Sequence, residues 1–282
     1  MRPAVRILEG LNRLFPKIEH PFNMQNRGEK TYAQWQFERG GDTVACFAPE
    51  FSPEDMFRGK DVLDMGCGAS GKSLYYLTVG AKTVTGVDVV AHYQAEAEAF
   101  AQALGYGDVF RFVVGDATRL PFPGGQFDTV IMNDFMEHVS DPEGALREAM
   151  RLLRPGGRVY VNFPPYYHPT GAHMSDVIGI PWVHLFFSEK TLIAAYKDLV
   201  RGLPDEKERL ALRFRLENGK ETMGYINKMT LKRFHNILRA QQITPLWYRE
   251  IPLRPWLRPL AKFPPVREMF VKMGVCVLEK GS

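Results

Sequence analysis

The stretch VLDMGCGASG, residues 62–71, joins a short apolar run to a glycine-rich loop, and it decides the fold of this chain. The apolar run is typical of a buried strand, and a helix is predicted to begin at Lys72 or Ser73. Gly66 and Gly68 permit a sharp turn and a close approach of the backbone to a ligand. Together with Gly71 they fit the pattern G-x-G-x-x-G, which is weak by itself because glycine is common. The stretch therefore predicts a ligand-cradling loop between a strand and a helix.

Short apolar runs alternate with helical stretches on both sides of this loop. The runs DVLDMG, TVTGVDV, VFRFVVGDA, FDTVIMND and GRVYVNF are predicted strands, and residues 73–79, 93–104 and 142–153 are predicted helices. Such alternation indicates a parallel sheet that is covered on both faces. LRPGG, residues 153–157, is expected to stop a helix and form a tight turn. Residues 60–163 are thus predicted to be a doubly wound α/β core.

The remaining segments have different patterns. Residues 1–59 are predicted to be helical, with one amphipathic helix in AVRILEGLNRLF and a second helix in TYAQWQFERGGDTVACFAP. Residues 164–230 lack the alternation, and we expect an insertion over the strand ends, with a surface elaboration as the alternative. Residues 231–282 are predicted to contain a helix and two late antiparallel strands that complete the sheet.

Composition limits the function. The chain has 282 residues and is 45% hydrophobic, enough for a large buried core. Its three cysteines are far apart in sequence, so neither a disulfide framework nor a structural zinc site is indicated. No apolar run is long enough to span a membrane and no leader pattern is evident, so a cytoplasmic location is predicted. From Arg201 onward, 17 Lys and Arg face 8 Asp and Glu, which predicts either attraction to phosphates or only a solvated basic face.

Two acidic residues help to identify the ligand of the glycine loop. Asp64 precedes the first glycine by two residues, and a carboxylate there favours a cationic or zwitterionic ligand over a pyrophosphate. Asp88 ends the next predicted strand, where a carboxylate can accept hydrogen bonds from ribose hydroxyls. The pair predicts a nucleoside ligand with a positive charge.

Together with the glycine loop, these two residues make the sequence resemble the class I S-adenosylmethionine-dependent methyltransferases. VLDMGCGASG is similar to the first motif of that family, GVD to the second, and GDATRLPFPGGQFDTVIMNDFMEHV and ALREAMRLLRPGGRVYV to the later strands and helix, over about residues 60–162. The resemblance implies a Rossmann-like, mostly parallel seven-stranded sheet and S-adenosyl-L-methionine as cofactor. The residues it implies for cofactor binding are Asp64, Gly66, Gly68, Asp88, Asp116, Ala117 and Asn133. As the alternative, Asp116 and Asn133 only form turns.

Catalytic candidates come after the fifth predicted strand, in NFPPYYHPTGAHMSD, residues 162–176. Open α/β sheets bind ligands at the carboxyl ends of their strands, and methyl transfer to a hydroxyl or a carbon needs a base near neutral pKa. We predict His173 as this base, with His168 and His184 as further candidates; for each, a structural histidine is the alternative. Tyr166, Tyr167 and Asp176 are predicted to line the acceptor pocket. The histidines are irregularly spaced, so no metal is predicted.

Other chemistry stays open. Glu137 and His138 follow the fourth predicted strand, where a catalytic share or a helix start is possible. An aromatic, loop-rich insertion suits a small or apolar acceptor, such as a lipid, isoprenoid or natural product, with O- or C-methylation favoured. The basic, aromatic tail at residues 251–273 indicates contact with a membrane surface, or only a basic rim. An RNA methyltransferase and a non-catalytic S-adenosylmethionine-binding protein are the rival functions, and nucleic-acid binding is not favoured because no RNA-binding module is recognised.

Overall fold

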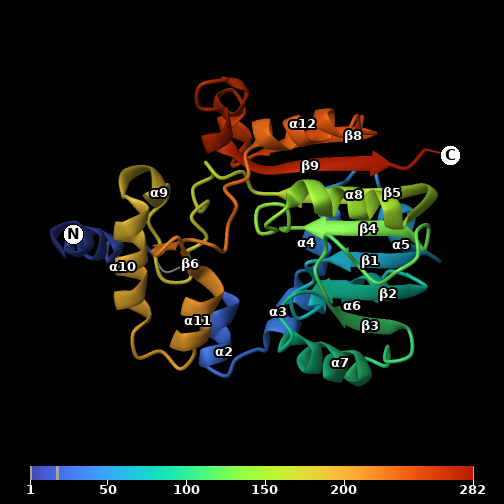
Figure 1. Cartoon of the computed structure of the whole chain (residues 1–282), viewed down its shortest axis with the longest axis horizontal. Coiled ribbons are helices and arrows are strands. Elements are labelled where there is room, and N and C mark those ends of the chain that lie inside the picture. The colour runs from blue at the N-terminus through green and yellow to red at the C-terminus, as the bar shows by residue number, and fades with distance from the viewer. Residues whose placement is uncertain (1, 17–18, 282) are drawn as a thin grey trace. The chain divides into compact units, whose positions relative to one another are not determined.

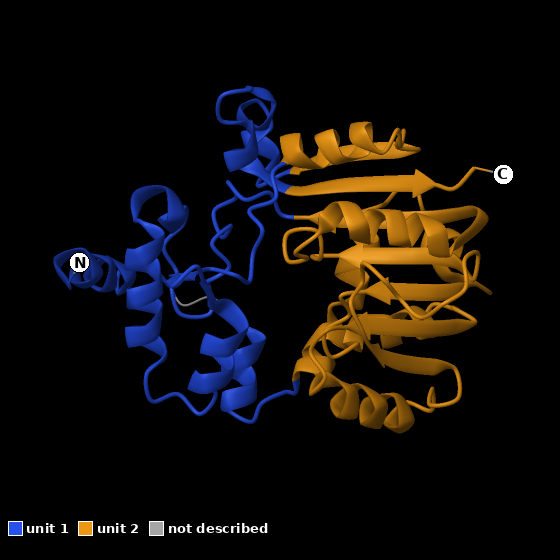
Figure 2. Cartoon of the chain, viewed as in Figure 1, with its two compact units in different colours: residues 1–31, 164–230, 252–272 blue, residues 32–163, 231–251, 273–282 orange. Residues whose placement is uncertain are grey.

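The structure is a computed structural model that describes residues 2–16 and 19–281. Its backbone forms two compact units, each built from separate stretches of sequence (Figure 2). Unit 1 contains residues 1–31, 164–230 and 252–272, and unit 2 contains residues 32–163, 231–251 and 273–282. No helix among the described residues has the length and apolarity needed to cross a bilayer.

Unit 2 contains a seven-stranded sheet in the order β3-β2-β1-β4-β5-β9-β8 (Figure 1). Its strands are β1 (Asp61–Met65), β2 (Thr83–Asp88), β3 (Phe110–Val114), β4 (Phe127–Asn133), β5 (Leu153–Phe163), β8 (Trp247–Pro252) and β9 (Val271–Glu279). The first five strands pair in parallel, and β9 is antiparallel to β5. The predicted α/β class and seven-stranded, mostly parallel sheet are confirmed.

The helices of unit 2 complete the α/β architecture. They are α3 (Tyr32–Glu38), α4 (Gly40–Ala45), α5 (Pro53–Phe57), α6 (Gly71–Thr78), α7 (Tyr93–Ala103), α8 (Pro142–Leu152) and α12 (Leu231–Ala240). Local sequence sets several of their ends. Asp141 caps α8 through the amide of Gly144, and Ser52 with Asp55 forms a capping box on α5. The expected helical N-terminal segment is also confirmed.

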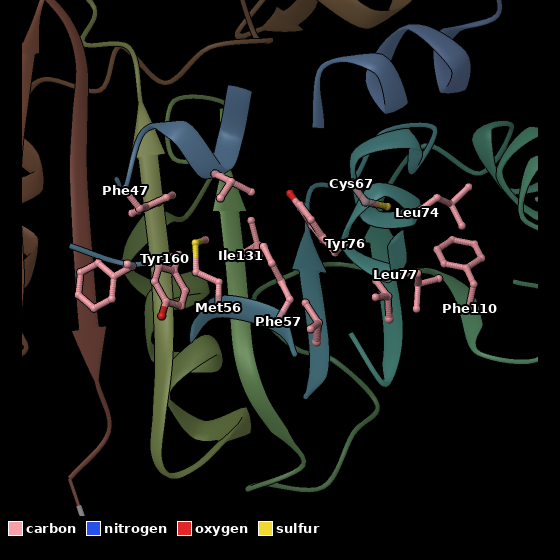
Figure 3. Packing of buried hydrophobic residues seen from close by; sticks show 14 of the residues in the cluster. Phe47, Met56, Phe57, Cys67, Leu74, Tyr76, Leu77, Phe110, Ile131 and Tyr160 are labelled. Carbon is pink, nitrogen blue, oxygen red and sulfur yellow. The ribbon is translucent and has the colours of Figure 1, made fainter. Parts of the chain in front are cut away.

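One face of the sheet packs against the helices that precede and follow β1 (Figure 3). Phe57 of α5 stacks on Tyr76 of α6 at 4.5 Å between ring centroids, and Phe47 meets Tyr160 of β5 edge to face at 5.2 Å. All four side chains are fully buried. Burying an aromatic side chain of this kind contributes roughly 1.5–3 kcal/mol, so this layer fixes the strand that carries the glycine loop.

Unit 1 is mainly helical. Its elements are α1 (Arg2–Asn12), α2 (Pro21–Asn26), α9 (Val183–Phe186), α10 (Glu189–Val200), α11 (Glu206–Arg213), the hairpin β6 (Arg215–Glu217) and β7 (Lys220–Thr222), and the 3-10 turns η1 (Pro255–Leu257), η2 (Leu260–Lys262) and η3 (Arg267–Phe270). The amphipathic pattern of α1 is explained by packing, because Val5 and Leu8 are buried in one apolar cluster with Leu192 and Tyr196 of α10.

A buried ionic cluster holds the middle of unit 1. The Asp176 carboxylate accepts a hydrogen bond from the Tyr196 hydroxyl at 2.6 Å and pairs with Arg209 at 2.9 Å and Arg213 at 3.0 Å. Arg209 also pairs with Asp205 at 2.7 Å. Burial alone would raise the pKa of Asp176, but the two guanidinium groups, His20 and the tyrosine hydroxyl hold it below its ordinary value. The cluster is self-neutralising, which is the condition for burying such charges.

Two local expectations differ from the structure. The single helix expected in TYAQWQFERGGDTVACFAP is divided into α3 and α4 around Arg39, next to the adjacent glycines Gly40 and Gly41. LRPGG is not a separate turn after α8, because β5 already begins at Leu153, which pairs with Phe127 before the register shifts. Gly156 has φ of +74°, so the glycine that was expected in a turn instead lies in the irregular first part of β5.

Candidate functional site: the loop at the end of the first strand

The glycine loop leaves β1 where the sheet order reverses. β1 pairs with β2 on one side and with β4 on the other, so their carboxyl ends share one edge of unit 2 (Figure 1). Open α/β sheets bind ligands at such a switch point. Gly66 has φ of +79° and Gly68 of +56°, and a Cβ on Gly66 would lie 2.4 Å from the ring of Phe135. Both glycines are therefore required by the backbone.

Helix α3 holds this loop, a feature that the loop motif itself did not reveal. The Gln36 side chain donates to the carbonyl of Cys67 at 3.2 Å and accepts from the amide of Gly71 at 3.2 Å. A Cβ on Gly71 would lie 1.9 Å from the carbonyl oxygen of Ala33. Gly71 thus serves the close approach of α3 to α6. The only sequence signal of this clamp is a glutamine on the buried face of a predicted helix.

Asp88 connects β2 to the loop. One carboxylate oxygen accepts from the amide of Gly68 at 2.8 Å and the other from the amide of Val90 at 2.9 Å. Burial raises the pKa of Asp88 above its ordinary value, although these amide hydrogen bonds oppose that shift. A carboxylate has about four lone-pair sites, so each oxygen can still accept a hydroxyl. The geometry fits a ligand with two neighbouring hydroxyl groups.

Asp64 lies within the sheet just before the loop, and its side chain is buried. Its carboxylate accepts from the Ser73 hydroxyl at 2.6 Å. Burial raises its pKa to about 6, with the Ser73 hydrogen bond and the charge of Lys72 opposing the rise. A buried carboxylate with a raised pKa lacks a full counter-charge, so this position favours a cationic group in a ligand.

The other implied cofactor residues take two different positions. Asn133 lies at the end of β4, where its side-chain carbonyl accepts from Thr43 at 3.0 Å and from Asn162 at 2.9 Å, which joins β4 to β5 and α4. Asp116 is exposed and accepts from the amide and hydroxyl of Thr118, as a turn-forming aspartate does. Ala117 beside it is buried. Asp88 and Asn133 therefore end the two strands that flank β1, and Asp64 lies one residue before the end of β1.

Glu137 lies in the turn after β4 and has a conspicuous environment. Its side chain is buried, and among the described residues neither carboxylate oxygen has a hydrogen-bond partner. The Nε2 atom of His138 is 3.8 Å away. Burial, followed by the charge of Asp134, raises the pKa of Glu137 well above its ordinary value. This carboxyl group is available to a ligand proton or donor.

From Pro164 onward, the predicted catalytic stretch belongs to unit 1. The Nδ1 atom of His168 accepts from the amide of Thr170 at 3.2 Å, and burial lowers the pKa of His168 to about 4. Burial also lowers the pKa of His184 to about 4, and its ring lies 4.8 Å from that of Tyr166. Such low values make both rings weak bases at neutral pH.

The other residues of that stretch differ in exposure and partners. His173 has φ of +51° and lines a small hollow with Arg213 and Tyr225. Tyr166 and Tyr167 meet edge to face at 5.4 Å, and Tyr167 is exposed. Asp176 has its carboxylate occupied within the ionic cluster described above, so it fills a structural position in unit 1. These assignments as pocket and base stay predictions.

Comparison with known proteins identifies the segment around the loop. Residues 63–161 match the family described as "Methyltransferase domain". A sterol 24-C-methyltransferase of Gibberella zeae is 34% identical over 99 residues, which are 35% of this chain and 26% of that protein. An ajmaline N-methyltransferase of Rauvolfia serpentina is 31% identical over 120 residues, 43% and 41% of the two chains. A ubiquinone biosynthesis O-methyltransferase of Pseudomonas fluorescens is 33% identical over 125 residues, 44% and 52%. The chain thus covers about half or less of the length of these relatives.

Solved structures extend the likeness to most of the chain, as a fold. A geranyl diphosphate methyltransferase in complex with SAM has a TM-score of 0.54 and 14% identity, covering 86% of this chain and 85% of that one. The [4+2]-cyclase SpnF has a TM-score of 0.51 and 17% identity, covering 88% and 80%. The strand order and the loop at the switch point agree with the matched segment: residues 63–161 are similar to a methyltransferase domain, and the fold is similar to that of the solved geranyl diphosphate methyltransferase.

Proposed function

We propose that the chain is an S-adenosylmethionine-dependent methyltransferase that acts on a small molecule. The observation that carries the proposal is Asp88, which ends β2, holds the amide of Gly68 and keeps acceptor capacity on both oxygens. S-Adenosylmethionine would supply a methyl group on a sulfonium. Asp88 would accept its ribose hydroxyls, Gly66 and Gly68 would let the backbone approach it, and Asp64 would hold its positively charged end.

The acceptor is proposed from the relatives and from the buried acidic group. The three relatives are named for transfer to carbon, nitrogen and oxygen, so the segment that they share with this chain does not specify the acceptor atom. Their names refer to a sterol, to ajmaline and to ubiquinone biosynthesis, which supports a hydrophobic small molecule here. His173 remains our proposed base, and Glu137 is a second candidate because its buried carboxyl has no hydrogen-bond partner among the described residues.

The proposal is tested by incubating the full chain with methyl-labelled S-adenosylmethionine and a metabolite extract. We expect enzyme-dependent label in the organic phase. Label that is confined to the aqueous phase and lost on nuclease treatment would support the RNA methyltransferase instead. Binding of S-adenosylhomocysteine without transfer to any acceptor would favour the non-catalytic binding protein, and preference for NAD would contradict the cofactor assignment.

Asp64→Asn is expected to raise the stability of the ligand-free protein and to lower its affinity for S-adenosylhomocysteine. With a folded pKa of about 6 against 3.8 for the ordinary group, ionised Asp64 weakens the fold above pH 6. The neutral amide should therefore stabilise the ligand-free protein at pH 8 by about 3 kcal/mol, while the affinity for S-adenosylhomocysteine falls. Denaturant unfolding and calorimetric titration measure the two effects. If stability and affinity both rise or both fall, Asp64 is not the partner of the ligand's positive charge.

His173→Ala is expected to lower the rate of methyl transfer about 10²-fold, because a general base contributes at least this much, while S-adenosylhomocysteine affinity stays unchanged. The matched control is His168→Ala, since the low pKa of His168 makes it a poor base. Single-turnover rates with a saturating methyl donor measure the effect. An unchanged rate for His173→Ala, with a loss for Glu137→Gln, would move the role of base to Glu137.

A further inference from the structure

Residues 254–263, here called the C-terminal knob, form a compact and highly exposed part of unit 1. The turns η1 and η2 follow each other, and the amide of Leu253 donates to the carbonyl of Phe270 at 2.9 Å, which closes the base of the segment. Trp256 is 76% exposed, Phe263 54% and Leu260 40%. The knob thus holds three large apolar side chains in a folded but solvent-facing arrangement.

Basic residues alternate with these apolar side chains. Arg254, Arg258 and Lys262 are all exposed, and among the described residues none of them forms an ion pair. The only acidic residue within residues 252–272 is Glu268, which lies in η3 and is partly buried. The knob therefore has an uncompensated charge of three cations around an aromatic centre.

We infer that the C-terminal knob docks on the surface of an anionic lipid bilayer. Tryptophan and phenylalanine bury their rings at the headgroup boundary, and each nearby lysine or arginine adds attraction to anionic lipid. Leu260 and the surrounding prolines offer no hydrogen bonds to bases or sugars, so the pattern suits lipid better than nucleic acid. A lipid-borne acceptor would then be collected from the same surface, a consequence that rests on the proposed function.

Vesicle binding of the full chain tests this inference without any methyl donor. Trp256 is the only exposed tryptophan, since the other three are partly buried. We expect its fluorescence to shift to the blue when vesicles of phosphatidylcholine with phosphatidylglycerol are added, and not with phosphatidylcholine alone. Trp256→Phe should remove the shift but keep co-sedimentation with the vesicles.

Charge reversal gives the decisive comparison. The triple variant Arg254→Glu, Arg258→Glu, Lys262→Glu is expected to bind anionic vesicles at least about tenfold more weakly. A control triple, Arg111→Glu, Lys190→Glu, Lys207→Glu, changes the charge equally at exposed cations outside the knob and should bind nearly as the parent does. Circular dichroism confirms that both variants fold.

Three results would overturn the inference. The first is equal binding of the parent chain to neutral and anionic vesicles, and the second is an equal loss of vesicle binding in the two triple variants. The third is a parent chain that does not bind vesicles but binds an RNA oligonucleotide, when only the knob triple variant loses this RNA binding. None of these bears on methyl transfer, so a failure here leaves the proposed function standing. Conversely, if the full chain binds vesicles through the knob but transfers no methyl group, only the proposed function is contradicted.

Discussion

Asp88→Ala is expected to weaken the binding of S-adenosylhomocysteine by about 10³-fold. Hydrogen bonds to a charged acceptor contribute about 1.5–3 kcal/mol each, and this carboxylate would accept two ribose hydroxyls. The substitution also removes the acceptor for the amide of Gly68, so the loop loses one of its anchors. Isothermal titration calorimetry of the purified protein measures the change directly.

The control for this prediction is Asp108→Ala, which removes an exposed carboxylate that precedes β3. It should leave the affinity within about twofold, because exposed groups contribute little. Asp88→Asn tests the role of charge, since the amide keeps one acceptor oxygen but cannot satisfy two amide donors. A parent-like affinity for Asp88→Ala would remove Asp88 from the cofactor site and, with it, the observation on which the proposed function depends.

Mild acid is expected to act on the two units in opposite directions. In unit 1, burial lowers the pKa of His20 and of His168 from 6.5 to about 4. A depressed folded pKa gives stability that is present above pH 6.5 and is lost as the pH falls toward 4, and at pH 5 each histidine costs about 2 kcal/mol. The Nδ1 atoms of both rings accept backbone amides, so protonation there also breaks a local turn or cap.

Unit 2 should respond with the opposite sign. Its buried carboxyls Asp64, Asp88 and Glu137 all have raised pKa values. A raised folded pKa of an acid means that the folded state binds more protons, so the penalty for ionisation is relieved as the pH falls. For Asp64 this gain between pH 8 and pH 5 is about 1 kcal/mol. Unit 2 is therefore expected to hold or gain stability over the interval in which unit 1 loses about 4 kcal/mol from His20 and His168.

Hydrogen exchange at pH 8, 6 and 5, corrected for the intrinsic rate, measures the two units separately. We expect the protection of α10 and α11 to fall with pH while that of β1 and β4 is maintained. The double variant His20→Asn, His168→Asn should reduce the response of unit 1, because neutral amides do not titrate, and leave the contribution of His184, whose pKa burial also lowers. A parallel loss of protection in both units would contradict this assignment of the histidine and carboxyl pKa values.

The sequence by itself determined the architecture of unit 2 and the approximate position of its site. Buried parallel strands must be continuous apolar runs, and a strand that enters a glycine loop before a helix leaves few alternatives, so β1, its loop and α6 were predictable. Asp64 and Asp88 could be singled out from the sequence because Asp64 precedes the first loop glycine by two residues and Asp88 ends the next predicted strand. The resemblance to a family added the remaining cofactor residues, of which Asp116 occupies a self-capped turn.

Only the tertiary structure decided the contacts between segments that are distant in sequence. The Gln36 side chain holds a loop that begins thirty residues later by two hydrogen bonds. Gly71 has no side chain because a Cβ there would collide with a backbone carbonyl oxygen of α3. The ion pairs of Asp176 with Arg209 and Arg213 are also contacts between distant segments, and they exist because charges in a core must be neutralised by whichever partners the fold brings near. Local pattern carries the period of a helix or a strand, but burial and counter-charge are set by chain packing, and these quantities determine whether a histidine or a carboxylate is a base, a ligand or a support.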